Sequence, residues 1–294
     1  MMTVEDASRL WGISGRRIRV LCEEGRIVGA VRMGRSWQIP EGVCKPEDQR
    51  PLRTLSTLLG EIRRKKEELD KRRPLTAGEI ERLQQEFAVE YTYNSNAIEG
   101  NTLTLKETAL VLQGLTVGAK PLKDHLEAVG HHQAFHYLGE LVRDNAPLTE
   151  SLIRQIHFLV LADKPEDRGV YRRVPVRILG ALHEPVQPFL IQQNMEQLLQ
   201  DYRESKEELI PRLARFHIEF EAIHPFIDGN GRTGRLLVNL ELMKAGFPAI
   251  DIKFADRAKY YEAFDGWHSG KKRDAMALLF ATYLNRRLDQ YLNL

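Results

Sequence analysis

The chain has 294 residues, of which 43% are hydrophobic and 29% are charged, a composition typical of a globular protein and not of a disordered one. It has no apolar run near the ~20 residues of a membrane helix, no secretory signal pattern at its start, and too few cysteines for a disulfide framework or a four-cysteine zinc site. We therefore expect a cytoplasmic protein with no membrane partner. The net charge of +2 means that any nucleic-acid binding must be local.

Residues 1–40 predict a small basic domain. They are typical of a helix, a turn at residues 12–14, a second helix and two short strands that turn at Gly34. Ser14 is a suitable N-cap for the second helix. Seven arginines against four acidic residues give this segment a charge of +3.

This pattern resembles the winged helix-turn-helix of excisionase and MerR-type DNA-binding proteins. In that resemblance Arg16, Arg17 and Arg19 lie on the second helix and Arg35 lies on the wing. Arginines in these places would meet phosphates or guanine edges of duplex DNA. The alternative is a small docking domain with solvated arginines.

Residues 41–75 predict a linker, because prolines punctuate the segment and the charged run at residues 61–73 is typical of a solvated helix. From residue 76 to residue 294, helical periodicity dominates. Thr76, with Glu79 three residues later, is a capping signal for the first of these helices. Further helical patterns lie at residues 104–115, 125–142, 149–161, 195–204, 212–223, 235–246 and 273–292.

Residues 170–191 differ from the rest of this region. They alternate in polarity and are rich in Val, Ile and Pro, which predicts a β-hairpin whose prolines keep it at an edge. The fold class is therefore mainly α: a helical bundle with one hairpin, preceded by a small N-terminal domain.

The segment from His224 to Arg235 carries the most chemical information. It joins two predicted helices through a loop that contains glycines, an asparagine and an acid. Glycines let successive backbone N–H groups turn inward, and the next helix adds its positive N-terminal end, so the loop is a candidate anion cradle. Arg232 and Arg235 share a helix face and suit a polyphosphate. Asp228 offers a hard oxygen to Mg²⁺, and His224 can act as a general base on a hydroxyl.

Other interpretations of this segment are weaker. Gly229, Gly231 and Gly234 also fit the dinucleotide-binding pattern GxGxxG, but that fold needs a strand before the loop and here a helix precedes it. The sequence has no Walker A motif. A purely structural interpretation would make the histidine a capping residue and the arginines surface residues.

HPFIDGNGRTGR resembles the signature of Fic (filamentation induced by cAMP) domain proteins, HPFx(D/E)GNGRxxR, at every defined position. Residues 214–217 before it and Tyr260-Tyr261 after it also match many Fic domains. The resemblance covers residues 76–294 and implies a Fic-type bundle in which the hairpin is the flap.

The resemblance also implies an activity, the transfer of AMP from ATP to a Ser, Thr or Tyr hydroxyl of a target protein. His224 would deprotonate the hydroxyl, and Asp228 would hold Mg²⁺ against the phosphates. The ATP-binding residues would be Gly229, Asn230, Gly231, Arg232 and Arg235 of the motif, Leu179 and Gly180 of the flap, and Tyr260. Related Doc kinases carry a lysine at the position of Gly231, so the glycine favours AMP transfer over phosphate transfer. His268 stands where some relatives have an asparagine, which leaves the adenine contact open.

SNAIEGN, residues 95–101, resembles the Fic inhibitory motif (S/T)xxxE(G/N) in full. The resemblance implies an inhibitory helix near residues 80–100, in which Ser95 supports Glu99 and Glu99 forms a salt bridge with Arg235 that competes with the γ-phosphate. By residue type alone, this segment would be a helix end with a solvated glutamate.

Two alternative functions stay open. In some relatives the glutamate orients a water that removes AMP, so the chain would be a de-AMPylase. A DNA-binding regulator that uses the Fic fold to sense nucleotide is the second alternative. The sequence is also compatible with a homodimer, and the pair His132 and His136 has metal-ligand spacing but favours a packing or surface role.

Overall fold

The computed structural model describes residues 1–34, 36–44, 54–72, 77–178 and 183–293. The chain forms two compact units, Met1–Leu52 and Arg53–Leu294. None of the helices in the described ranges is long and apolar enough to cross a bilayer.

The N-terminal unit contains two helices and a three-stranded antiparallel sheet of order β1-β3-β2. Its elements are β1 (Met2–Thr3), α1 (Val4–Trp11), α2 (Gly15–Glu23), β2 (Val31–Met33) and β3 (Ser36–Ile39). Gly12 ends α1 with a φ of 63°, and the Ser14 hydroxyl caps α2 by accepting from the N–H of Arg17. The fully buried side chains of Ile18 and Ile39 join the helices to the sheet.

The order of helices and strands agrees with the sequence prediction, except that Met2–Thr3 add a strand beside β3. The likeness to DNA-binding domains stays a prediction.

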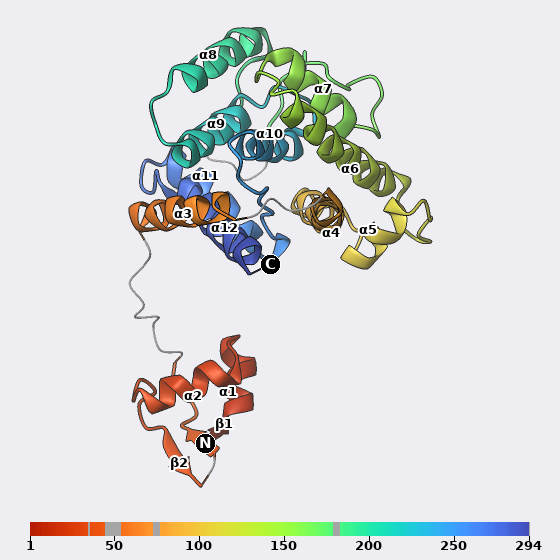
Figure 1. Cartoon of the computed structure of the whole chain (residues 1–294). Coiled ribbons are helices and arrows are strands. Elements are labelled where there is room, and N and C mark those ends of the chain that lie inside the picture. The colour runs from red at the N-terminus through yellow and green to blue at the C-terminus, as the bar shows by residue number, and fades with distance from the viewer. Residues whose placement is uncertain (35, 45–53, 73–76, 179–182, 294) are drawn as a thin grey trace. The chain divides into compact units, whose positions relative to one another are not determined.

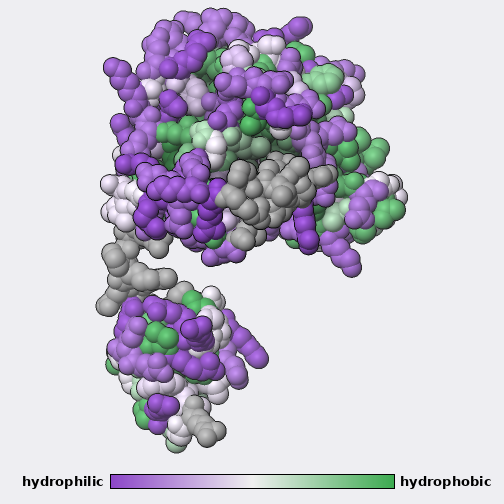
Figure 2. All heavy atoms as spheres, in the orientation of Figure 1, coloured by the Kyte–Doolittle hydropathy of each residue, from purple (hydrophilic) through white to green (hydrophobic). Residues whose placement is uncertain are grey.

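The second unit is a helical bundle around α10, as Figure 1 shows. Leu236, Leu237 and Leu240 of α10 have no exposed surface, because α10 packs against α6, α7 and α9. Its elements are α3 (Leu55–Asp70), α4 (Ala77–Ile98), α5 (Leu105–Leu112), α6 (Leu122–Arg143), α7 (Glu150–Val160), η1 (Pro188–Leu190), α8 (Ile191–Glu204), α9 (Leu209–Ile223), α10 (Asn230–Lys244), η2 (Phe254–Asp256), α11 (Arg257–His268) and α12 (Ala275–Leu292). Figure 2 shows a surface on which hydrophilic residues dominate and hydrophobic residues occur in scattered groups.

The expectation of a solvated helix inside a linker at residues 41–75 is wrong for α3. This helix packs along α12, with Leu58 and Ile62 only 2% and 1% exposed. Lys65 is buried as well and forms an ion pair of 2.5 Å with Asp289. Leu58 and Ile62 lie four residues apart, so one face of an otherwise charged helix is apolar enough to pack.

The predicted β-hairpin at residues 170–191 is not formed by the described part of that segment. Residues 170–178 and 183–187 contain no strand. Arg172 links the two described parts of the segment, residues 170–178 and 183–187. Its guanidinium donates to the carbonyl of Val174 at 3.0 Å and to the carbonyl of Val186. Prolines in both parts cannot donate to a strand ladder, which explains why a side chain supplies the cross-link.

Candidate functional site

The motif loop begins where α9 ends at Ile223. His224 is the C-cap residue of α9 and has the left-handed conformation φ 50°, ψ 60°. This conformation is uncommon outside glycine, and it turns the chain from α9 toward α10. The loop ends at Gly229, which is the N-cap of α10 and has a left-handed conformation with a φ of 75°. The predicted helix–loop–helix arrangement of the motif is therefore confirmed.

Asn230 holds this loop in shape. Its side-chain amide donates to the carbonyl of Phe226 and accepts from the N–H of Phe226, both at 3.0 Å. The side chain is buried at 2% exposure. Asn230 can therefore offer a phosphate its backbone N–H at the start of α10, but not its side chain.

His157 of α7 supports the loop, although no sequence pattern pointed to this residue. Its ring stacks on Phe226 with centroids 3.6 Å apart. Its Nδ1 accepts from the N–H of Gly169 at 2.9 Å, so its Nε2–H donates to the carbonyl of Asp228 at 2.9 Å. Burial lowers the pKa of His157 to about 4, so the ring is neutral and keeps this tautomer.

Arg172 supports the other end of the loop. The side chain is 5% exposed and donates to the carbonyls of His224 at 2.7 Å and Ile223 at 3.3 Å. Its own N–H donates to the carbonyl of Pro225 at 2.9 Å. These bonds satisfy carbonyls that the end of α9 leaves without helical partners, and they fix the backbone from which the His224 ring projects.

Asp228 lies among cationic groups. Its Oδ2 is 2.5 Å from Nζ of Lys164, and its Oδ1 is 3.2 Å from Nη2 of Arg232 and accepts from the N–H of Gly229 at 2.6 Å. Burial raises the pKa of this carboxyl, but Arg232 and Lys164 outweigh burial and lower the pKa to about 2. Asp228 is therefore an anion at neutral pH.

The surroundings of Asp228 fit Mg²⁺. Asp228 is an anionic carboxylate whose Oδ2 pairs with the partly exposed Lys164, and Mg²⁺ binds proteins through one or two carboxylates plus substrate phosphates. No cluster of three or more metal-ligating side chains occurs among the described residues.

Arg232 and Arg235 differ in their partners. Arg232 is 1% exposed and pairs with Glu127 of α6 at 3.2 Å as well as with Asp228. Arg235 is 3% exposed, and its Nη1 lies 2.8 Å from Oε1 of Glu99. Arg232 therefore holds α6 to the loop, whereas Arg235 faces the residue that follows α4.

Glu99 occupies the space above the N-terminus of α10. A Cβ atom on Gly231 would lie only 2.2 Å from Oε1 of Glu99 and 3.1 Å from Nη1 of Arg235. Anions favour this position, because the first N–H groups of a helix and the helix dipole both point to it. The carboxylate of Glu99 thus lies where the sequence analysis expects phosphate.

Helix α4 is fixed in the core beside this contact. Ser95 is 1% exposed; its hydroxyl accepts from Nε of Arg235 at 3.0 Å, and its carbonyl accepts from Nη2 at 2.7 Å. Asn94 bonds Asp251 at 2.7 Å and the N–H of Phe254 at 3.0 Å. The structure therefore brings Ser95 and Glu99 to Arg235, as the sequence analysis expects.

Tyr260 lies behind Arg235 instead of lining an open pocket. The residue is 2% exposed, and its hydroxyl bonds Nε2 of His217 at 2.6 Å and Nη1 of Arg235 at 3.3 Å. In this structure Tyr260 therefore positions Arg235, and its predicted contact with ATP stays a prediction. Its neighbour Tyr261 is 38% exposed and is the more accessible ring.

His224 is suited to accept a proton. Burial lowers its pKa to about 4, and the Arg172 guanidinium acts in the same direction. Its Nδ1 has no hydrogen-bond partner among the described residues. A neutral imidazole at the edge of an anion site can take a proton from a hydroxyl at physiological pH.

Several predicted residues lie elsewhere or outside the described residues. Arg16 and Arg19 are exposed on α2, whereas Arg17 is half-buried. Leu179, Gly180 and Arg35 lie outside the described residues.

The rings of His132 and His136 form a pair with their Nε2 atoms 3.1 Å apart. His268, the departure noted in the sequence, stacks on His183 with centroids 4.0 Å apart. Among the described residues, neither pair of histidines has a contact with the motif loop.

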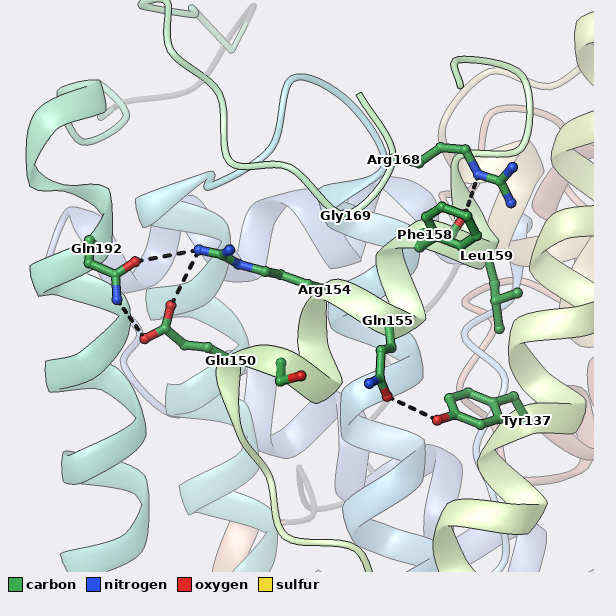
Figure 3. A pocket seen from close by; sticks show the side chains of 10 residues that line it. Tyr137, Glu150, Arg154, Gln155, Phe158, Leu159, Arg168, Gly169 and Gln192 are labelled. Atoms are coloured by element: carbon green, nitrogen blue, oxygen red, sulfur yellow. Dashed lines mark hydrogen bonds and ion pairs between the residues drawn. The ribbon is translucent and has the colours of Figure 1, made fainter. Parts of the chain in front are cut away.

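A separate hollow of about 960 Å³, shown in Figure 3, lies along a face of α7 other than the one that carries His157. Its polar side chains bond one another: Gln155 accepts from the Tyr137 hydroxyl at 3.0 Å, and Gln192 donates to Glu150 at 2.9 Å. Arg168 lies against Phe158, with its Nε bonded to that residue's carbonyl at 2.7 Å. The residues of the motif do not line this hollow.

Together, the glycine-rich loop, the helix N-terminus and the buried arginines define a helical domain with an anion site next to a neutral histidine. Residues 147–242 match the model of the Fic/DOC family. The chain therefore contains a Fic domain.

The curated relatives are named as enzymes. Protein adenylyltransferase Fic of Nematostella vectensis is 34% identical over 266 residues, which cover 85% of this chain and 61% of that protein. The protein of the same name from Drosophila melanogaster is 33% identical over 220 residues, which cover 73% of this chain and 44% of that protein. The chain thus spans about half the length of the curated relatives that it matches.

Solved structures agree with the fold. A Fic domain containing signaling protein from Bacteroides thetaiotaomicron superposes with a TM-score of 0.71 at 28% identity, covering 80% of this chain and 96% of that one. A fragment of Fic-1 from C. elegans also gives a TM-score of 0.71 at 28% identity, covering 81% of this chain and 71% of that one.

Proposed function

We propose that this chain is a protein adenylyltransferase that transfers AMP from ATP to a hydroxyl side chain of a target protein. The observation that carries the proposal is the anion site at the start of α10, with Arg235 on one side, Asp228 on another and the neutral ring of His224 at its edge. The names of the curated relatives support the same activity.

In this proposal the backbone N–H groups at the start of α10 and Arg235 hold the phosphates of ATP. Asp228 would hold Mg²⁺, which neutralises phosphate charge when it is bound. The oxygen of the target hydroxyl forms a bond to the α-phosphorus, and His224 takes the proton of that hydroxyl. The bond from the α-phosphorus to the bridging oxygen breaks, and pyrophosphate leaves.

The test is transfer of labelled AMP from ATP to protein in a lysate, with the chain compared with His224→Ala. We expect the variant to lose transfer while it still binds ATP, because the loop and the arginines bind phosphate without the ring. Transfer by the variant at the rate of the wild type would refute the role of His224.

We also propose that Glu99 inhibits this site. The carboxylate lies 2.8 Å from Arg235 and fills the space above Gly231, so it competes for the place of the γ-phosphate. Removal of AMP by the same site is the alternative, in which Glu99 would orient a water.

A second proposal concerns the N-terminal unit, which we infer to bind duplex DNA through α2. The exposed arginines Arg16 and Arg19 lie three residues apart on this helix, so they share a face. Replacing both with alanine should weaken binding to duplex DNA and reduce the log–log salt slope by about one for each phosphate that an arginine no longer neutralises. If the wild type binds no duplex at low salt, the unit is a docking module and this proposal fails.

A further inference from the structure

Both oxygens of Asp228 are held by groups of the chain itself, but the two sets of partners differ. Oδ1 accepts from the N–H of Gly229 and from Arg232, whereas Lys164, 2.5 Å away, is the partner of Oδ2 among the described residues. Oδ1 therefore already has two donors, whereas a metal ion on Oδ2 would lie beside the positive charge of Lys164.

Arg232 cannot leave easily. Its side chain is 1% exposed and is also paired with Glu127 of α6. Moving it would leave a buried guanidinium without its acidic partners, which is costly. The N–H of Gly229 belongs to the loop backbone and is equally fixed.

Lys164 can leave. It lies after the end of α7, and its side chain is 37% exposed. Nearby, Oδ1 of Asp163 has no hydrogen-bond partner among the described residues. The ammonium can therefore move toward solvent or toward Asp163 without a large penalty, and Oδ2 is the oxygen that becomes free for a metal ion.

We propose that Lys164 holds the place of the divalent cation at Asp228 and must be displaced when a metal–ATP complex binds. The inference rests on the proposed function. In this proposal the chain supplies both charges of the metal–nucleotide complex before that complex binds. Glu99 lies at the position of the phosphate anion, and Lys164 lies at the position of the metal cation. A metal–nucleotide complex replaces both internal charges together.

If Lys164 holds this place, Mg²⁺ should increase the affinity for ATP less than it would in a site that contained Asp228 without a neighbouring ammonium. Mg²⁺ must compete with an ammonium on the same oxygen, and the displaced ammonium still repels it. Without metal, Lys164 also attracts the phosphates. Removing its charge should therefore strengthen ATP binding with Mg²⁺ relative to ATP binding without it.

The experiment measures the Kd of ATP by calorimetry in MgCl₂ and in EDTA, with Glu99→Gly as the parent. The readout is the Kd in EDTA divided by the Kd in MgCl₂. We expect Lys164→Met to raise this ratio by roughly two- to fivefold, the range expected for the loss of a partly exposed ion pair. Lys164→Arg keeps the charge and should stay near the parent. The control Lys66→Met removes a lysine that pairs with Asp70 at the same 2.5 Å on α3, and it should leave the ratio unchanged.

A second measurement uses Mn²⁺ alone and follows the free ion by electron paramagnetic resonance. Lys164→Met should bind Mn²⁺ more tightly than the parent, and thermal unfolding checks that each variant is folded. ATP binding with an unchanged or lower ratio in Lys164→Met would overturn the role of Lys164 only. Absence of ATP binding in every variant would refute the proposed function, and this inference with it.

Discussion

Replacing Glu99 with glycine should raise AMP transfer, including transfer onto the chain itself. In the wild type, the carboxylate of Glu99 lies 2.8 Å from Nη1 of Arg235 and above the start of α10. A γ-phosphate that binds Arg235 must displace it. Removing the carboxylate frees that part of the guanidinium and opens the space next to Gly231.

The size of the effect follows from the burial of the pair. Arg235 is 3% exposed and Glu99 is 31% exposed, so solvent screens the contact only in part. A charge-assisted hydrogen bond in such a place is worth about 1.5–3 kcal/mol. A gain of about ten- to a hundredfold in productive binding of Mg-ATP is therefore expected.

The assay is a time course of labelled AMP incorporation, together with calorimetry of Mg-ATP binding. Glu99→Gln should fall between the wild type and Glu99→Gly, because it removes the charge and keeps the volume. Ser95→Ala should activate less, since it removes one of the contacts that hold Arg235 beside Glu99. Arg235→Ala should not activate, because it removes the phosphate contact as well. Glu90→Gln is the control, since Glu90 is a glutamate of α4 that pairs with Lys253.

Three results would contradict this reasoning. If Glu99→Gly is no faster than the wild type, the carboxylate does not inhibit. If the variant instead loses the ability to remove AMP from a pre-modified target, Glu99 belongs to the removal reaction. Equal activation by Glu90→Gln would show that any loss of acidic charge on this part of the chain has the same effect.

Two further predictions concern pH and packing. Because the pKa of His224 is lowered to about 4, its ring stays deprotonated between pH 7.5 and pH 5.5. The rate of transfer should change less than about twofold over this range, whereas a histidine with an ordinary pKa would lose about tenfold in rate. A tenfold loss of rate in a chain that circular dichroism shows to be folded would contradict this. Gly234→Ala should destabilise the fold by about 1–3 kcal/mol in denaturant unfolding, because the new Cβ would lie 2.8 Å from the buried ring of His217 and from Glu221. The matched change Gly139→Ala on α6 meets nothing within 4 Å and should be neutral or stabilising, so equal stability of the two variants would refute the packing argument.

The sequence predicted the parts of the site that are continuous in the chain. The loop from His224 to Arg235 could be recognised because its glycines, its acid and its arginines stand at fixed spacing. The contact of Glu99 with Arg235 came only from the resemblance, since the two residues are far apart in sequence. No local pattern indicates that Glu99, just after α4, reaches Arg235 of α10.

The groups that hold the loop could not be predicted in this way. His157 lies within an amphipathic helix, where a buried histidine looks like any other core residue. Arg172 lies in a stretch whose alternation favoured strands, and its role depends on carbonyls of residues 223–225. Lys164 is an ordinary lysine until the fold places it beside Asp228.

The anchoring of α4 has a consequence for how fast the proposed inhibition can respond. Ser95 and Asn94 hold the helix to Arg235, Asp251 and Phe254, and none of these bonds involves the Glu99 side chain. Release then needs only rotation of the Glu99 side chain, which follows the last residue of the helix and is already partly in solvent. Such rotations take picoseconds to nanoseconds, far less than the movement of a packed helix. Release of Glu99 would therefore not be the step that limits how fast the site responds to a nucleotide.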